Sequence, residues 1–99
     1  MSAKPTRPAA VPTVQVENDR VKVTEWRFTP GAATGWHRHA YDYVVVPMTT
    51  GRLQLDEGSQ QRFAELTAGR SYYRPQGVEH DVINANDFEF VFVEVEFKA

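Results

Sequence analysis

The amino-acid sequence predicts an all-β fold, either a sandwich or a barrel. Short runs of β-branched and aromatic residues recur about every eight to twelve residues, with turn signals between them. No stretch shows ten or more residues of helical spacing with capping residues. The 99 residues suffice for one hydrophobic core and are too few for two. We therefore expect one domain over residues 12–99, preceded by a flexible, proline-containing tail over residues 1–11.

The first two strands are expected on either side of a turn at Asn18-Asp19. Valines alternate with polar residues between positions 14 and 24, which is typical of half-buried strands. Trp26 and Phe28 take the opposite parity. This change predicts a bulge near Glu25, or a strand that is apolar on both faces.

The middle of the chain predicts further short strands separated by glycine turns. The continuous apolar run at residues 43–46 suits a strand that is covered on both faces. Gly51 is expected to turn the chain into a strand at residues 53–56, and residues 63–66 carry the next strand. Pro75-Gln76-Gly77 predicts a turn whose glycine has a positive φ angle.

The last predicted strand, residues 88–97, is apolar on both faces. One face carries Val91, Val93, Val95 and Phe97, and the other carries Phe88, Phe90 and Phe92. A barrel strand has one core side, so we expect the phenylalanine face to meet a second subunit in a twofold-symmetric homodimer. A bulge that reverses the parity midway is the alternative.

Composition and charge exclude several classes of function. The net charge of −2 and the scattered Lys and Arg residues argue against nucleic acid as the main partner. With no cysteine, disulfides, thiolate metal sites and cysteine nucleophiles are all absent. The longest apolar run is far too short to span a bilayer, and no signal-peptide pattern is present, so we expect no membrane partner and a cytoplasmic location.

The three histidines of the chain are the candidate functional residues. His37 and His39 point the same way on an extended strand, because side chains alternate faces with a period of two. His80 lies in a second patterned stretch, residues 69–84. If the fold brings that stretch beside the first pair, the three imidazoles meet at one point.

Two motifs in the sequence resemble those of the cupin family. Gly31-x5-His37-x-His39, followed by a strand and Gly51, resembles the first cupin motif, and Gly69-x5-Pro75-x-Gly77-x2-His80-x3-Asn84 matches the second. The resemblance implies a double-stranded β-helix, or jelly-roll barrel, with a metal site near its mouth. The stretch from His37 to Tyr43 also resembles small stand-alone cupins linked to β-alanine degradation.

The first motif departs from the family pattern at one position. Cupins normally have a glutamate separated from the second histidine by three or four residues, and those positions are Tyr43 and Val44 here. Asp42 is the nearest carboxylate and falls one place early. Asp42 and Tyr43 are therefore candidates for a fourth metal ligand or for a place in the pocket, whereas Asp81 should face outward beside His80.

Three neutral imidazoles predict one divalent transition metal, with iron, manganese, nickel and zinc as the candidates. Without a carboxylate ligand the positive charge of the ion is uncompensated, which favours a small anionic ligand. Several further side chains are candidates for lining the ligand pocket, although Asn84 could instead satisfy the backbone groups of a turn. These candidates are Trp36, Tyr41, Phe63, Tyr73 and Asn84.

Two classes of function fit these residues. The first is a metal-dependent enzyme acting on a small anionic metabolite, of the dioxygenase, isomerase or lyase type that the cupin resemblance implies. The second is a non-catalytic metal- or ligand-binding barrel that is accessory to a catabolic pathway. No serine-hydrolase elbow, phosphate-binding loop or dinucleotide fingerprint is present, so any catalysis has to come from the metal.

Overall fold

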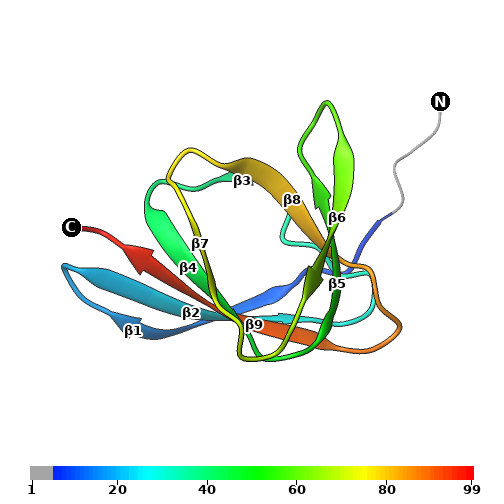
Figure 1. Cartoon of the computed structure of the whole chain (residues 1–99), viewed down its shortest axis with the longest axis horizontal. Coiled ribbons are helices and arrows are strands. Elements are labelled where there is room, and N and C mark those ends of the chain that lie inside the picture. The colour runs from blue at the N-terminus through cyan, green and yellow to red at the C-terminus, as the bar shows by residue number, and fades with distance from the viewer. Residues whose placement is uncertain (1–5) are drawn as a thin grey trace.

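The computed structural model describes residues 6–99, which form two antiparallel sheets facing each other in a barrel (Figure 1). The larger sheet has the strand order β1-β2-β9-β4-β7, and the smaller has the order β3-β8-β5-β6. The strands are β1 (Val11–Glu17), β2 (Val21–Phe28), β3 (His37–Arg38), β4 (Asp42–Pro47), β5 (Gly51–Asp56), β6 (Gln61–Leu66), β7 (Tyr72–Arg74), β8 (Glu79–Asn84) and β9 (Phe90–Phe97). The predicted all-β, double-stranded β-helix fold is confirmed. No helix in residues 6–99 could span a membrane.

The core lies between the two sheets and follows the alternation of the strands. In β4, Tyr43, Val45 and Pro47 are buried, whereas Val44 and Val46 are half-buried on the outer face. The strand therefore has apolar side chains on both faces, as its continuous β-branched run predicts. Several large side chains with less than 2% of their surface exposed fill the interior, namely Tyr43, Phe28, Phe90 and Leu53.

Of the two alternatives for the change of parity in β2, the strand with apolar side chains on both faces is confirmed. The bulge near Glu25 is wrong, because the irregularity lies in the neighbouring strand. Residues 21–28 of β2 pair with β9 in continuous register, whereas β1 shifts register between Val14 and Val16. Trp26 and Phe28 pack with the core. The β1 strand is exposed along its whole length, so its valines are not half-buried.

The phenylalanine face of the last strand points into the barrel, so the prediction that it meets a second subunit is wrong. Phe90 and Phe92 have 0% and 4% of their surface exposed and belong to the core. The β9 strand lies between β2 and β4, with one face toward the smaller sheet. That face requires the bulky rings, and the valines of β9 lie on the opposite face.

The structure attaches the end of the expected tail to the barrel. Ala10 is buried, and its amide donates a hydrogen bond to the carbonyl of Ala33 at 2.9 Å. Ala9 also bridges to Ala33, and β1 begins at Val11. Ala9, Ala10 and Val11 of the expected tail therefore belong to the barrel, and the small alanines fit against the loop before β3. Residues 1–5 of the expected tail lie outside the described residues.

Two motif glycines serve different purposes. Gly77 has a φ of 92°, as the predicted turn requires. Gly51 begins β5 instead of forming a positive-φ turn, and a Cβ atom there would lie 2.9 Å from Oδ1 of Asn86. The Asn86 side chain accepts a hydrogen bond from the amide of Arg52 and donates one to its carbonyl. Gly51 is thus required by the close approach of Asn86.

Candidate metal centre

The fold brings the three histidines together through pairing between the two motifs. His37 on β3 lies directly opposite His80 on β8. His39 follows β3, and its amide donates a hydrogen bond to the carbonyl of Val78 at 2.9 Å, while its carbonyl accepts one from the amide of Gly77 at 2.8 Å. The turn of the second motif therefore holds the end of the first.

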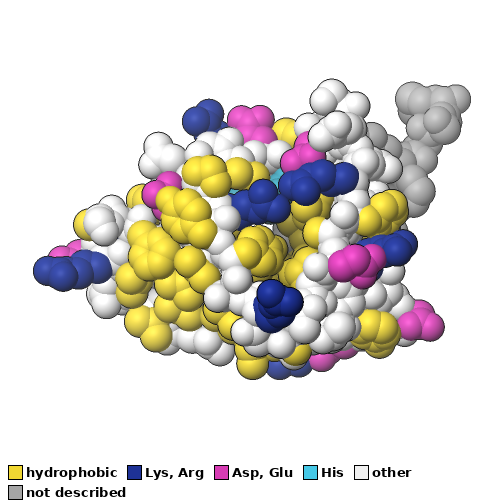
Figure 2. Space-filling model, in the orientation of Figure 1, with side chains coloured by type: hydrophobic (Ala, Val, Ile, Leu, Met, Phe, Trp, Pro, Cys, Tyr) yellow, Lys and Arg dark blue, Asp and Glu magenta, His cyan; other side chains and the backbone are white. Residues whose placement is uncertain are grey.

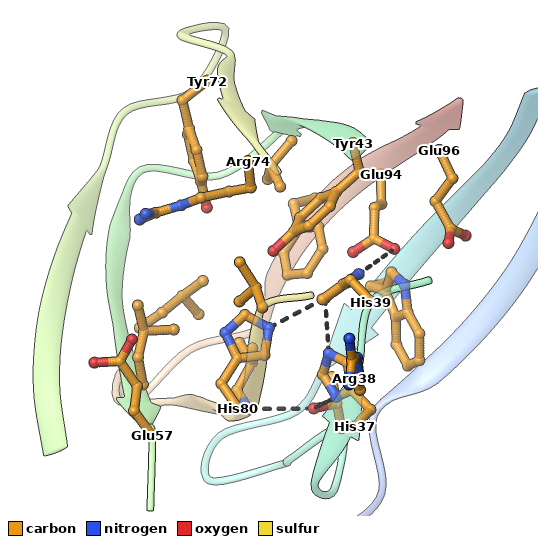
Figure 3. A pocket seen from close by; sticks show the side chains of 18 of the residues that line it. His37, Arg38, His39, Tyr43, Glu57, Tyr72, Arg74, His80, Glu94 and Glu96 are labelled. Carbon is orange, nitrogen blue, oxygen red and sulfur yellow. Dashed lines mark hydrogen bonds and ion pairs between the residues drawn. The ribbon is translucent and has the colours of Figure 1, made fainter. Parts of the chain in front are cut away.

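The imidazoles converge through their Nε2 atoms, as Figure 3 shows. Nε2 of His39 lies 3.0 Å from Nε2 of His37 and 3.2 Å from Nε2 of His80. His39 and His80 are buried, and His37 is half-buried. Nitrogens that share one transition-metal ion at about 2.0–2.1 Å have similar mutual separations. The donor set therefore fits a single divalent transition-metal ion.

The protonation of the site also suits a metal. Burial, together with the nearby His37, lowers the pKa of His39 to about 3. The same two causes lower the pKa of His80 to about 4. Both rings are neutral at neutral pH, so their lone pairs are available for coordination.

The tautomer of His37 is set by the loop before β3. Its Nδ1 lies 2.9 Å from the carbonyl oxygen of Gly35. A carbonyl only accepts hydrogen bonds, so this contact favours the tautomer with the proton on Nδ1, in which Nε2 has a free lone pair. An outer hydrogen bond of this kind is typical of metal-binding histidines.

Tyr43 occupies the inward position where the family's glutamate is absent. Its ring stacks on the His39 imidazole, with centroids 3.9 Å apart and planes at 17°. Val44 lies on the outer face, so the ambiguity between the two positions is settled in favour of Tyr43. Burial, and then the nearby Glu94, raises the pKa of the Tyr43 phenol far above its usual range. Tyr43 therefore lines the site as a neutral phenol.

Asp42 lies away from the histidines, so the prediction that it is a ligand or a pocket residue is wrong. It begins β4 with outward parity, and its carboxylate accepts a hydrogen bond from the amide of Gln76 at 2.8 Å. Hydrogen bonds from Tyr73 and then Gln76 lower the pKa of Asp42. Its carboxylate thus holds the turn after β7.

A buried carboxylate that the sequence interpretation missed lies beside the histidines. Glu94 on β9 is 8% exposed, and its Oε1 lies 4.0 Å from Nδ1 of His39. Burial, and then the nearby Glu96, raises the pKa of Glu94 to about 7. Because His39 is neutral, this contact does not join two opposite charges. A charged residue within the apolar run of β9 is the signal that could have identified Glu94.

The histidines open onto a cavity of about 290 Å³ inside the barrel. Its walls combine apolar side chains with charged groups from both sheets (Figure 3). Arg74 extends from β7 on the opposite side of the cavity from Glu94 and Glu96. The most informative lining residues are Trp26, Tyr43, Leu53, Arg62, Tyr72, Arg74, Phe92, Glu94 and Glu96.

The predicted pocket-lining residues do not line this cavity. They are Trp36, Tyr41, Phe63, Tyr73 and Asn84. Trp36 and Phe63 have 54% and 55% of their surface exposed. Tyr73 is outward because strand alternation directs its neighbours Tyr72 and Arg74 inward. Asn84 is buried elsewhere, where its amide donates hydrogen bonds to the carbonyls of Phe28, at the end of β2, and of the loop residues Thr29 and Phe88. It satisfies backbone groups, as the alternative for this residue predicted.

The two-sheet barrel with histidines near its mouth is the architecture of a cupin, and the sequence comparison agrees. The profile described as "Cupin domain" matches residues 24–96. The chain belongs to the cupin family.

Individual relatives cover nearly the whole chain. BauB of Pseudomonas aeruginosa, named a β-alanine degradation protein, is 62% identical over 92 residues, which are 93% of this chain and 97% of BauB. A cupin domain from Bordetella pertussis has 64% identity and a TM-score of 0.94, covering 97% of this chain and all of that one. A double-stranded β-helix protein from Klebsiella pneumoniae has 22% identity and a TM-score of 0.76, with 96% and 82% coverage, and shows the fold alone.

We predict that Asp42→Asn leaves the zinc affinity unchanged and lowers the free energy of unfolding. The folded-state pKa of Asp42 is lowered, so its ionisation stabilises the fold above the ordinary value of 3.8, and this stabilisation is lost as pH falls through the lowered value. Urea unfolding of both proteins should show the largest difference above about pH 4 and convergence in stronger acid. Weaker zinc binding by the variant would contradict this prediction and would indicate that Asp42 is a metal ligand.

Proposed function

We propose that this protein is a metal-dependent cupin enzyme that acts on a small anionic metabolite at its three-histidine site. The observation that supports the proposal best is the convergence of three imidazole Nε2 atoms at the cavity wall, with contacts of 3.0 and 3.2 Å. A divalent iron, manganese, nickel or zinc ion held there supplies a Lewis acid with open coordination positions. An open site of this kind favours catalysis over a purely structural role.

The charges of the cavity support a carboxylate-bearing ligand. Arg62 and Arg74 both line the cavity, and Arg62 is paired with Glu57 at 2.9 Å. Arg74 lies over the ring of Tyr72, with its guanidinium carbon 5.5 Å from the ring centroid. In the described residues no carboxylate pairs with Arg74, so its fork of N–H donors can bind a ligand carboxylate.

The relative from Pseudomonas aeruginosa supports a metabolic setting. Its name assigns BauB to β-alanine degradation. At 62% identity over nearly the full length, we assign this chain to the same kind of catabolic step. The cavity volume of about 290 Å³ suits a metabolite of a few carbon atoms. Among the reaction types found on the cupin scaffold, we favour dioxygenase-type chemistry.

We expect the purified protein to hold one divalent metal ion per chain and His80→Ala to hold none. Elemental analysis gives the metal content, and Asp42→Asn is the matched control that should retain it. The iron-loaded protein should consume oxygen with β-alanine or a three-carbon acid derived from it, and His80→Ala should not. Tight ligand binding without turnover in the iron, manganese, nickel and zinc forms would identify a binding module instead.

Arg74→Gln should raise the KM for the acid substrate about tenfold or more, because it removes a charged hydrogen bond to the carboxylate. Its kcat should change less, since the side chain binds substrate in the ground state as well. Arg20→Gln is the control, because Arg20 lies outside the cavity and forms no salt bridge in the described residues. A KM unchanged by Arg74→Gln would exclude this residue from substrate binding.

We also propose that two copies of the chain pair through the outer face of the larger sheet. A row of apolar residues crosses all five strands in register, in the order Val16, Val23, Val95, Val44 and Tyr73. Figure 2 shows hydrophobic side chains gathered over the β1, β2, β4 and β7 side of the molecule. Four strands of about eight residues give a flat area on the order of 500 Å². Protruding side chains make the accessible surface larger than this flat area, so that it approaches the roughly 800 Å² that each partner of a stable dimer buries.

Val95→Asp should convert the dimer into a monomer, because it places a charge at the centre of that row. Size-exclusion chromatography with light scattering measures the mass. Phe63→Asp is the matched control, since Phe63 is 55% exposed on the smaller sheet. A monomeric wild-type protein, or a dimer that survives Val95→Asp, would exclude this interface.

A further inference from the structure

Two of the three histidines have an identifiable group next to Nδ1, the nitrogen that faces away from the cluster. At His37 this group is the carbonyl of Gly35, 2.9 Å from Nδ1. At His39 it is the carboxylate of Glu94, with Oε1 4.0 Å from Nδ1. Figure 3 shows Glu94 on the side of His39 that faces away from His37 and His80. In both rings, an oxygen that can accept a hydrogen bond therefore lies next to Nδ1.

Glu94 cannot be a ligand to the same ion in this geometry. The three Nε2 atoms define the metal position, and Glu94 approaches the opposite nitrogen of His39. Its carboxylate is 8% exposed and comes from β9, a strand outside both cupin motifs. A buried carboxylate is costly unless a positive group or a hydrogen-bond donor accompanies it. Metal binding supplies both, because it adds positive charge to the imidazole and fixes the proton on Nδ1.

We propose that Glu94 is a positioning residue that accepts a hydrogen bond from Nδ1 of His39 when the metal is bound. Closing the gap from 4.0 Å to an ordinary hydrogen-bond length of about 2.8 Å requires a shift of roughly 1 Å. Glu94 thereby orients the His39 ring and holds its Nε2 lone pair toward the ion. It also supplies, from β9, the negative charge that Tyr43 does not supply at the glutamate position of the first motif. The inference rests on the proposed metal site.

The stacking of Tyr43 adds a geometric reason for this role. Tyr43 lies against one face of the His39 ring at 3.9 Å and restrains its tilt. Stacking leaves rotation within the ring plane free, and a partner in that plane at Nδ1 is needed to fix it. Glu94 is placed on the Nδ1 side. Together the two residues restrain His39 in both respects.

The first test is zinc affinity, measured by competition with a chromogenic chelator. Glu94→Gln keeps the size of the side chain and removes its charge, so we expect zinc to bind about tenfold or more weakly. Glu96→Gln is the matched control, because it is the same substitution two residues away on the same strand. Its effect should be much smaller. Equal losses in the two variants would indicate general electrostatics and overturn the specific role of Glu94.

The second test examines the hydrogen bond itself, first in the zinc-loaded wild-type protein and then in Glu94→Gln. Proton–nitrogen correlation NMR should show a resonance for the proton on Nδ1 of His39. This resonance should be shifted downfield, and the proton should exchange slowly with water. Glu94→Gln should move this resonance upfield, which a role in packing alone would not do. A resonance unchanged by the substitution would overturn the proposal.

The outcomes also separate this inference from the proposed function. Failure of the wild-type chain to bind zinc would remove the metal site itself. Tight zinc binding by the wild type and an unaffected Glu94→Gln variant would remove only the role of Glu94. Two zinc ions per wild-type chain, with one lost in Glu94→Gln, would also contradict the proposal, because Glu94 would then ligate an ion of its own with His39 and Glu96.

Discussion

Two backbone hydrogen bonds join the first motif to the second at the point where the imidazoles meet. They run from His39 to Val78 and from Gly77 to His39. His39 follows a strand of only two residues, which is too short to fix a side chain by itself. The two hydrogen bonds are therefore needed to hold His39 in place. The positive φ of Gly77 lets the turn approach closely enough to form both bonds. The geometry of the metal centre therefore depends on a turn that contributes no ligand.

Charge is distributed unevenly around this centre. The buried imidazoles of His39 and His80 are neutral, cationic side chains come from β3, β6 and β7, and the buried carboxylate lies on β9. A metal ion would bind to neutral imidazoles, and the carboxylate of Glu94 lies next to Nδ1 of His39, on the other side of that ring. An acid entering the cavity would meet Arg74 on the side opposite Glu94. This arrangement keeps a ligand carboxylate apart from the protein's own buried carboxylate.

The sequence was sufficient to predict the all-β fold, the convergence of His37, His39 and His80, and the turn at Gly77. The fold and the turn follow from period-two alternation and from turn residues, which are local properties, whereas the convergence of the histidines was implied by the resemblance of the two motifs to the cupin family. The last strand could not be resolved in this way, because apolar residues on both faces leave the inward side undetermined. Only the packing of β9 between β2 and β4 shows that Phe92 and Glu94 face inward. The error over the phenylalanine face and the failure to recognise Glu94 therefore have one cause.

The aromatic residues near the histidines were misassigned for a related reason. Trp36 is adjacent to His37 in sequence and yet is largely exposed, because proximity along the chain does not determine the direction of a side chain. Tyr72 and Tyr73 are both tyrosines on a three-residue strand, and composition alone does not say which one faces the cavity. The partner sheet decides the matter through the register of β7 with β4.

The contact between Gly51 and Asn86 has a consequence for how this chain can evolve. The Asn86 side chain occupies the space that a side chain at position 51 would need, and it binds the backbone of Arg52 in doing so. Position 51 can therefore acquire a larger residue only if position 86 changes at the same time. Among homologues these two sites should covary as a pair, although they lie in different segments of the chain and neither contacts the histidines.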